Sequence, residues 1–195
     1  MENKDAISAR FPFLRLSSML ISKFDKSGIT ATVDKHRNEG TQRMAIDKDL
    51  CLGQYDLKTA RKQTGKKKEP VAHQTEALDA LGKWFDGPST SRTGGLLVIP
   101  TGGGKTFTAT RFLCRFPLSD GYKVLWLAQS HHLLEQASSS FEENVRFISE
   151  PKNSLTTRIV SGERAHFKPR HIKVSDDVII ATLQTISNAK FNVIH

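Results

Sequence analysis

The stretch I99-P-T-G-G-G-K-T-F-T-A109 decides how the rest of the chain is interpreted. Its three consecutive glycines, Gly102 to Gly104, let a backbone adopt left-handed angles and approach an anion closely. Their N–H groups and the start of a following helix would offer partial positive charge to phosphate oxygens. Lys105 adds a full charge for the β- and γ-phosphates, and Thr106 adds a hydroxyl suited to Mg²⁺. The stretch predicts a phosphate-binding loop.

Apolar segments flank the glycines in the order that such a loop requires. The run at 96–100 is continuously apolar and bounded by turn residues, which is typical of a strand covered on both faces. Ala109, Phe112, Leu113 and Phe116 then recur at helical spacing. A loop between a buried strand and a helix is the context in which the motif is informative. A glycine-rich turn that happens to precede Lys-Thr remains the alternative.

The glycine spacing narrows the kind of loop. The general pattern G-x-x-x-x-G-K-[ST] would place its leading glycine at Ile99, so the simplest match is incomplete. A dinucleotide-binding fingerprint would need a further glycine at Phe107, and the chain has none there. We therefore interpret the loop as one for a nucleoside triphosphate.

Strand and helix patterns alternate after residue 70. Helical periodicity is clear at 72–85 and again at 134–145, where Ser130 is placed to cap the helix. Short apolar runs that predict buried strands lie at 123–128, 157–160 and 177–181. This order predicts an α/β fold with a largely parallel sheet, of the P-loop NTPase type.

Composition and charge set limits on the protein class. The chain of 195 residues has a formal net charge of +9 and 37% hydrophobic residues, as in a folded domain with a polyanionic partner. Its two cysteines and seven histidines show no metal-ligand spacing. The apolar stretch at 11–21 contains Arg15, is too short to span a bilayer and lacks the basic start of a signal peptide. We expect a cytoplasmic protein with no membrane contact.

The first 69 residues differ from the rest in polarity, periodicity and charge. They are polar, weakly periodic and basic, and the run K58-T-A-R-K-Q-T-G-K-K-K68 has six basic residues and no acidic one. This run is either a solvated linker or a nucleic-acid contact. We expect residues 1–69 to form a basic extension or small accessory region, and residues 70–195 to form the nucleotide-binding domain.

Four segments of the second part occur in a familiar order. Residues 70–195 resemble the first RecA-like domain of superfamily 2 helicases, and most closely the Res-subunit-like branch of type III restriction enzymes. In that group the phosphate loop usually begins Pro-Thr-Gly and often lacks the leading glycine, as here. The other three matching segments are H73-Q-x-x-A-L78, V124-L-W-L-A-Q-S-H-H-L-L-E-Q136 and V178-I-I-A-T-L-Q-T-I186.

The resemblance implies a role for each matching residue. Lys105 would be catalytic, and Gln74 would read the adenine edge, although alone it would be taken for an exposed helix residue. The phosphates would be bound by Thr101, Gly102, Gly103, Gly104, Lys105 and Thr106, with Thr106 also on the metal. Sequence-independent contacts to a nucleic-acid backbone would come from Gln129, Ser130, Thr182, Gln184 and Thr185. The alternative for Gln129 and Ser130 is a purely structural role, at the end of the strand and as the cap of the helix. The family often has Arg at the position of His131, so that contact would be weaker here.

The resemblance also implies an activity and partners. We expect the ATP-binding part of an ATP- and Mg²⁺-dependent helicase or translocase on DNA rather than RNA, with a second RecA-like domain, in a restriction or defence system. Asp176 and Asp177 precede their apolar run, so they do not match the family's Asp-Glu box, and residues 191–195 look like the start of the strand that leads to it. We thus expect the 195-residue chain to bind ATP without turnover. A binding module without turnover and an unrelated P-loop NTPase remain alternatives.

Overall fold

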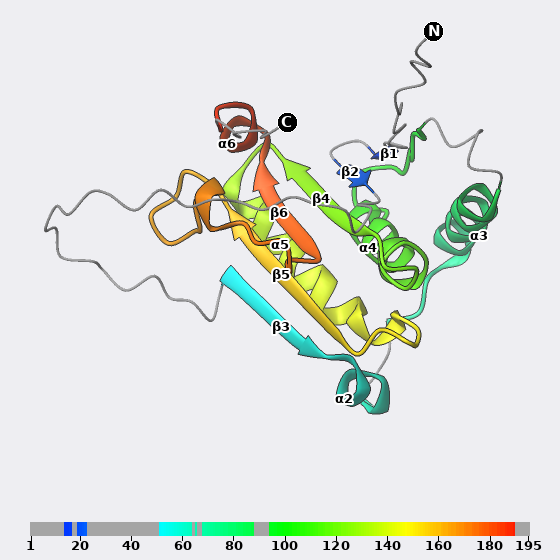
Figure 1. Ribbon diagram of the computed structural model, residues 1–195. Helices are drawn as coiled ribbons and strands as arrows, with labels where there is room; N and C mark the ends of the chain where they lie inside the picture. Colours follow the sequence, from blue (N-terminus) through cyan, green and yellow to red (C-terminus); the bar gives the residue numbers. More distant parts are fainter. Residues whose placement is uncertain are drawn as a thin grey trace, which may run out of the picture.

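A computed structural model describes residues 51–63, 65, 68–87 and 94–189, together with two short strands nearer the N-terminus. A six-stranded sheet of order β1-β2-β4-β6-β5-β3 runs through the molecule (Figure 1). The strands are β1 (Leu14–Leu16), β2 (Met19–Ser22), β3 (Leu52–Asp56), β4 (Lys123–Ala128), β5 (Ser154–Val160) and β6 (Val178–Thr182).

The helices follow the periodicity of the sequence. They are α2 (Leu57–Lys62), α3 (Ala72–Asp86), α4 (Lys105–Arg115), α5 (His131–Asn144) and α6 (Leu183–Ser187), with 3₁₀ turns η2 (Val145–Phe147) and η3 (Pro169–His171). The three predicted helices are therefore confirmed as α3, α4 and α5. Val145 opens a 3₁₀ turn rather than ending α5.

The centre of the sheet is parallel. β4 and β5 both pair in parallel with β6, in registers where Val178 of β6 lies beside Val124 on one side and Thr157 on the other. The outer pairings of β2 with β4 and of β3 with β5 are antiparallel. The fold is thus α/β, as predicted, and its parallel part is the three-stranded centre, in which β4 and β6 carry the start of two matching segments.

Residues 51–63 belong to the same sheet as the residues after 70. β3 forms one edge of the sheet beside β5, and Leu57 at the start of α2 is fully buried. The division into 1–69 and 70–195 stays a proposal. If it is right, part of the accessory region packs directly on the nucleotide-binding domain.

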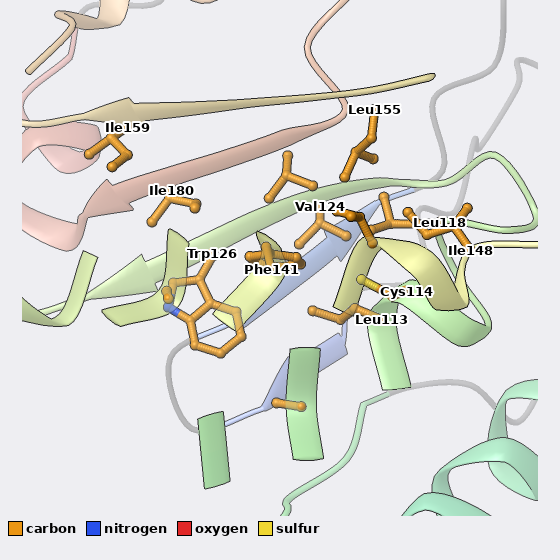
Figure 2. Packing of buried hydrophobic residues seen from close by; sticks show 14 of the residues in the cluster. Leu113, Cys114, Leu118, Val124, Trp126, Phe141, Ile148, Leu155, Ile159 and Ile180 are labelled. Atoms are coloured by element: carbon orange, nitrogen blue, oxygen red, sulfur yellow. The ribbon is translucent and has the colours of Figure 1, made fainter. Parts of the chain in front are cut away.

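The hydrophobic core lies between the sheet and helices α4 and α5, which pack against each other (Figure 1). Phe112 of α4 and Phe141 of α5 are fully buried. Figure 2 shows Phe141 next to Trp126 of β4, and the two rings meet edge to face with centroids 5.8 Å apart. Aromatic pairs in this geometry add to the stabilisation from apolar burial. This packing fixes the position of α4, and the glycine-rich loop lies at the N-terminal end of that helix.

The segment at 96–100 corrects the sequence-based prediction of a buried strand. It has no regular secondary structure, and Leu96 and Val98 are 76% and 79% exposed, whereas Ile99 is buried. A strand covered on both faces needs a neighbour that pairs with its backbone. No strand in the described part of the chain pairs with this segment, and the position beside β4 is held by β2. Apolar composition alone does not reveal whether such a neighbour exists.

The described helices include none that is both long and apolar enough to cross a membrane.

Candidate functional site

The glycine-rich loop turns sharply before helix α4. Gly102 and Gly104 have positive φ angles of 81° and 83°, where residues with a Cβ atom are strained. The N–H of Gly103 donates to the carbonyl of Pro100 at 3.0 Å and closes the turn. Gly104 is the N-cap of α4 and provides no capping side chain, so the first N–H groups of the helix are not covered by one.

The loop packs closely against its own stem and against α3. A Cβ atom on Gly103 would lie 2.6 Å from Cγ2 of Ile99, and one on Gly104 would lie 2.4 Å from Nε2 of Gln74. Neither distance is tolerated between real atoms. A larger residue at either position would therefore force the Ile99 or the Gln74 side chain to move.

Gln74 connects α3 to this loop. Its Nε2 donates to the carbonyl of Gly103 at 2.9 Å, and its Oε1 accepts from the N–H of Val71 at 3.1 Å. The side chain is 8% exposed, so the alternative of an exposed helix residue is wrong. His73 adds a second contact, because its Nε2 lies 3.0 Å from the same Gly103 carbonyl. Both ends of the Gln74 amide are thus used by the backbone, and its contact with adenine stays a prediction.

Lys105 and Thr106 begin helix α4 directly after the glycines. The Lys105 ammonium donates to the carbonyls of Ile99 and Pro100, at 3.1 and 3.3 Å, at the stem of the loop. Thr101 and Lys105 are exposed and Thr106 is half-buried. Among the described residues no partner hydrogen-bonds to the Thr106 hydroxyl. The Lys105 ammonium, which can bind phosphate, and the Thr106 hydroxyl, which can bind a metal ion, therefore lie beside uncapped backbone N–H groups.

These groups fit a nucleoside triphosphate with Mg²⁺. The positive-φ glycines and the first turn of α4 present donors for phosphate oxygens, and Gly102 has open space where a side chain would be. Lys105 would neutralise charge on the phosphates, and Thr106 would be the protein ligand of the ion, which keeps several waters. In the described part of the chain, no group of three or more His, Cys, Asp or Glu side chains could hold a metal by itself.

A second group of predicted residues lies at the carboxyl ends of β4 and β6. These strands are neighbours, with Ala128 beside Thr182, so Gln129 and Ser130 follow one strand end and Gln184 and Thr185 follow the next. Gln129, Ser130 and Gln184 are exposed. The carboxyl ends of parallel strands are where α/β sheets bind ligands.

Not all of these side chains are equally available. Thr182 is 5% exposed and caps α6, because its Oγ1 accepts from the N–H of Thr185 at 3.3 Å. It also donates to the Thr185 hydroxyl at 2.7 Å. Ser130 stands at the N-cap position of α5 as predicted but makes no capping hydrogen bond with its side chain. Its exposed hydroxyl is thus not used by the helix.

The description "Type III restriction enzyme, res subunit" belongs to a family model that matches residues 67–193. The chain belongs to this res subunit family. The match covers the loop, Gln74 and both strand ends, and it starts close to the expected boundary at residue 70. A search of curated proteins and a search of solved structures gave no match. Membership confirms the P-loop, RecA-like fold and a domain related to ATP-dependent helicases.

Asp176 and Asp177, which do not match the Asp-Glu box of the res subunit family, lie away from these strand ends. Asp176 and Asp177 precede β6, at the amino end of the parallel strands. Asp176 is 2% exposed and binds the Arg158 guanidinium through both carboxylate oxygens, at 2.6 and 2.9 Å. Asp177 accepts from Lys152 at 2.7 Å and from the N–H of Thr156 at 2.8 Å. Both carboxylates thus anchor the start of β6.

Part of the basic run at 58–68 is used inside the domain. Arg61 donates to the carbonyls of Ile148, Ser149 and Lys152, which holds α2 against the turn before β5. The ammonium of Lys68 lies 5.1 Å from the centre of the Phe107 ring. Arg61 is therefore neither part of a solvated linker nor free for nucleic acid, whereas Lys58, Lys62 and Lys68 are exposed.

Two contacts were missed by the sequence analysis of this res subunit family member. His73 precedes Gln74, but nothing in the sequence shows that its ring reaches Gly103. His131 and His166 are far apart in the sequence and stack with ring centroids 5.7 Å apart. Contacts of this kind have no local sequence signal, because they depend on which distant segments the fold brings together.

Proposed function

We propose that the chain is the ATP-binding part of an ATP-dependent helicase or translocase that acts on DNA. The observation that carries this proposal is the loop itself: two left-handed glycines open α4 directly before Lys105 and Thr106. Family membership supplies the ATP-dependent, helicase-like class of the domain. DNA as the substrate, a second RecA-like domain as partner and a role in restriction or defence are parts of the proposal.

ATP would bind with its phosphates over the loop at 101–106. The Lys105 ammonium now donates to two carbonyls at the stem, and phosphate oxygens would replace them as stronger, charged acceptors. The Thr106 hydroxyl would hold Mg²⁺, which would supply positive charge to offset that of the phosphates. Gln74 would hold Gly103 in place and, in addition, meet the adenine edge. Lys105 would thereby neutralise charge on the transferred phosphoryl group.

The nucleic-acid backbone would lie along the carboxyl ends of β4 and β6. Gln129, Ser130 and Gln184 are exposed there and would donate to phosphate oxygens without reading the base sequence. Thr182 and Thr185 would contribute through the capped start of α6. The net charge of +9 supports association with a polyanion. Cys51 and Cys114 are buried thiols that are not joined in a disulfide, which is compatible with the cytoplasmic location that we propose.

A second candidate is a nucleotide- and nucleic-acid-binding module without turnover. It is favoured by one observation: Asp176 and Asp177 are both engaged at the amino end of β6. Phosphoryl transfer needs carboxylates that hold the metal and orient water, and neither of these is free for that role. This candidate shares the ATP site and the nucleic-acid site with the first and differs only in catalysis.

The experiment compares matched single-stranded DNA and RNA of one sequence by fluorescence anisotropy, with and without Mg·ATP, over a series of salt concentrations. We expect DNA to bind more tightly, with affinity that falls steeply with salt and changes when Mg·ATP is present. Gln129→Ala and Gln184→Ala should weaken binding, whereas Gln136→Ala, an exposed glutamine on α5, should not. Nucleic-acid binding that ignores both salt and Mg·ATP would contradict the proposal.

A further inference from the structure

Two histidines meet behind the strand ends. His131 is the first residue of α5, and His166 lies in the connection between β5 and β6. Their rings stack with centroids 5.7 Å apart and planes 22° apart. The hydroxyl oxygen of Ser161 lies 2.7 Å from Nδ1 of His166 and 3.4 Å from Nδ1 of His131. The fold therefore brings two titratable rings to one buried hydroxyl.

The two rings differ in exposure and in charged neighbours. His166 is 5% exposed, whereas 44% of the His131 side chain is exposed. Nδ1 of His131 lies 3.3 Å from a carboxylate oxygen of Glu163. Burial lowers the pKa of His166, and the charges of His131 and Lys168 lower it further, while Glu135 and Glu163 act in the opposite direction. Burial therefore disfavours a charge on His166, whereas the exposed His131 ring has the Glu163 carboxylate beside it.

The loop that carries Glu163 is held in position by the backbone contacts of one lysine. The Lys168 ammonium donates to the carbonyls of Ser161, Gly162 and Glu163, at 3.2, 3.0 and 2.6 Å. Since this ammonium is engaged, it does not pair with the Glu163 carboxylate in the structure. The His131 ring is thus the ionisable group that the structure places beside the Glu163 carboxylate.

His131 directly follows Gln129 and Ser130, which the proposed function assigns to the nucleic-acid backbone. A phosphodiester at those two residues would lie next to the exposed edge of the His131 ring. Histidine is the side chain whose charge ordinarily changes between pH 5 and 8. In its protonated form the ring would donate a charge-assisted hydrogen bond to a phosphate oxygen, in competition with Glu163.

We propose that His131 is a proton-dependent phosphodiester contact, and that Glu163 holds the protonated ring when no nucleic acid is bound. The inference rests on the proposed function, since it refines the same nucleic-acid site. The direction of the pH dependence follows from linkage: because the complex favours protonated His131, the affinity for nucleic acid is higher at pH 6 than at pH 8. His166, whose pKa is lowered by burial, keeps the His131 ring in position by stacking.

The test measures the affinity of a labelled single-stranded oligonucleotide at pH 6 and pH 8 at constant ionic strength. We expect the unmodified chain to bind at least about fivefold more tightly at pH 6, the lower end of ordinary coupling between sites. His131→Gln should lose most of this difference, and its salt dependence at pH 6 should decrease by about 0.7 in log–log slope, as for one lost phosphate contact. His131→Arg should bind tightly at both pH values.

His132→Gln is the matched control, because His132 is the exposed neighbour on the same helix and should behave as the unmodified chain. Thermal unfolding of each variant shows whether the fold is retained, and His131→Arg keeps the test informative if His131→Gln is unstable. Binding whose pH dependence is the same in His131→Gln and His132→Gln would overturn this inference alone. Absence of binding in every protein, His131→Arg included, would overturn the proposed function and the inference with it.

Discussion

The side-chain amide of Gln74 donates a 2.9 Å hydrogen bond to the main-chain carbonyl of Gly103, in the middle of the glycine-rich loop. The same amide accepts from the N–H of Val71 at the start of α3. A residue that resemblance assigns to base recognition is therefore also the link between a helix and the loop that would hold the phosphates. If Gln74 also meets the adenine edge, this one side chain would couple the shape of the loop to the choice of base.

Gln74→Ala tests this coupling. Loss of the two hydrogen bonds should weaken binding of both ATP and GTP, because Gly103 is no longer held. If Gln74 also meets the adenine edge, the affinity for ATP falls more than that for GTP. Competition of ATP and GTP against a fluorescent nucleotide measures both effects, with Gln136→Ala as control. An equal loss would reject adenine recognition by Gln74, and unchanged affinities would reject the link itself.

Gly102 and Gly121 form a matched pair for testing the loop. Both have a positive φ, 81° and 79°, and neither has an atom within 4 Å of the position where a Cβ would lie. Gly102→Ala and Gly121→Ala should each lower the free energy of unfolding by about 1–2 kcal/mol, from backbone strain. Only Gly102→Ala should also weaken binding of Mg·ATP. Denaturant unfolding and nucleotide titration on both variants decide, and equal nucleotide affinities would argue against phosphates at this turn.

Asp176 and Arg158 form a buried ion pair whose side chains are 0% and 5% exposed. Asp176→Ala leaves the guanidinium buried without its carboxylate, so the free energy of unfolding should fall by about 3–5 kcal/mol. Glu143→Ala, at an exposed position on α5, should change it by no more than about 0.5 kcal/mol. Urea unfolding followed by circular dichroism gives both values. A loss below 1 kcal/mol for Asp176→Ala would show that the pair does not anchor β6.

Because Asp176 and Asp177 are engaged away from the phosphate loop, we expect residues 1–195 alone to bind Mg·ATP without hydrolysing it. An arginine finger by itself is worth roughly 10³–10⁵ in rate, and in the described part of the chain neither Asp176 nor Asp177 is available to the phosphates, so turnover should stay near the uncatalysed rate. A phosphate-release assay on the purified chain checks this. Steady release that disappears in Lys105→Ala would mean that catalytic carboxylates lie at positions we did not assign.

Sequence patterns predicted those parts of the structure that depend on neighbouring residues. The periodicity from Ala109 to Phe116 located α4, and the order Gly-Lys-Thr located the loop in front of it. The burial of 96–100 was predicted wrongly, because apolar composition does not show whether a strand has a pairing neighbour. The outer strands β1, β2 and β3 were not predicted, since their short segments show no clear alternation.

For the candidate site, too, the sequence predicted the motif residues but not the contacts between distant segments. The loop residues and Gln74 are adjacent in the structure, as the resemblance implied. The stacking of His131 on His166 and the pairing of Arg158 with Asp176 could not be predicted, because each joins residues that lie far apart in the sequence and meet only in the folded sheet. Such contacts follow from sheet order, which a single sequence specifies only through the complete fold.

The most direct test of the account is calorimetric titration of Mg·ATP into the unmodified chain, Lys105→Ala and Lys83→Ala. Lys83 is an exposed lysine on α3 and serves as the control for a lost surface charge. Charge-assisted hydrogen bonds contribute about 1.5–3 kcal/mol, so Lys105→Ala should bind about 10- to 150-fold more weakly, while Lys83→Ala should match the unmodified chain. Equal affinity of the unmodified chain and Lys105→Ala for Mg·ATP would contradict the central claim that this loop holds the phosphates of ATP.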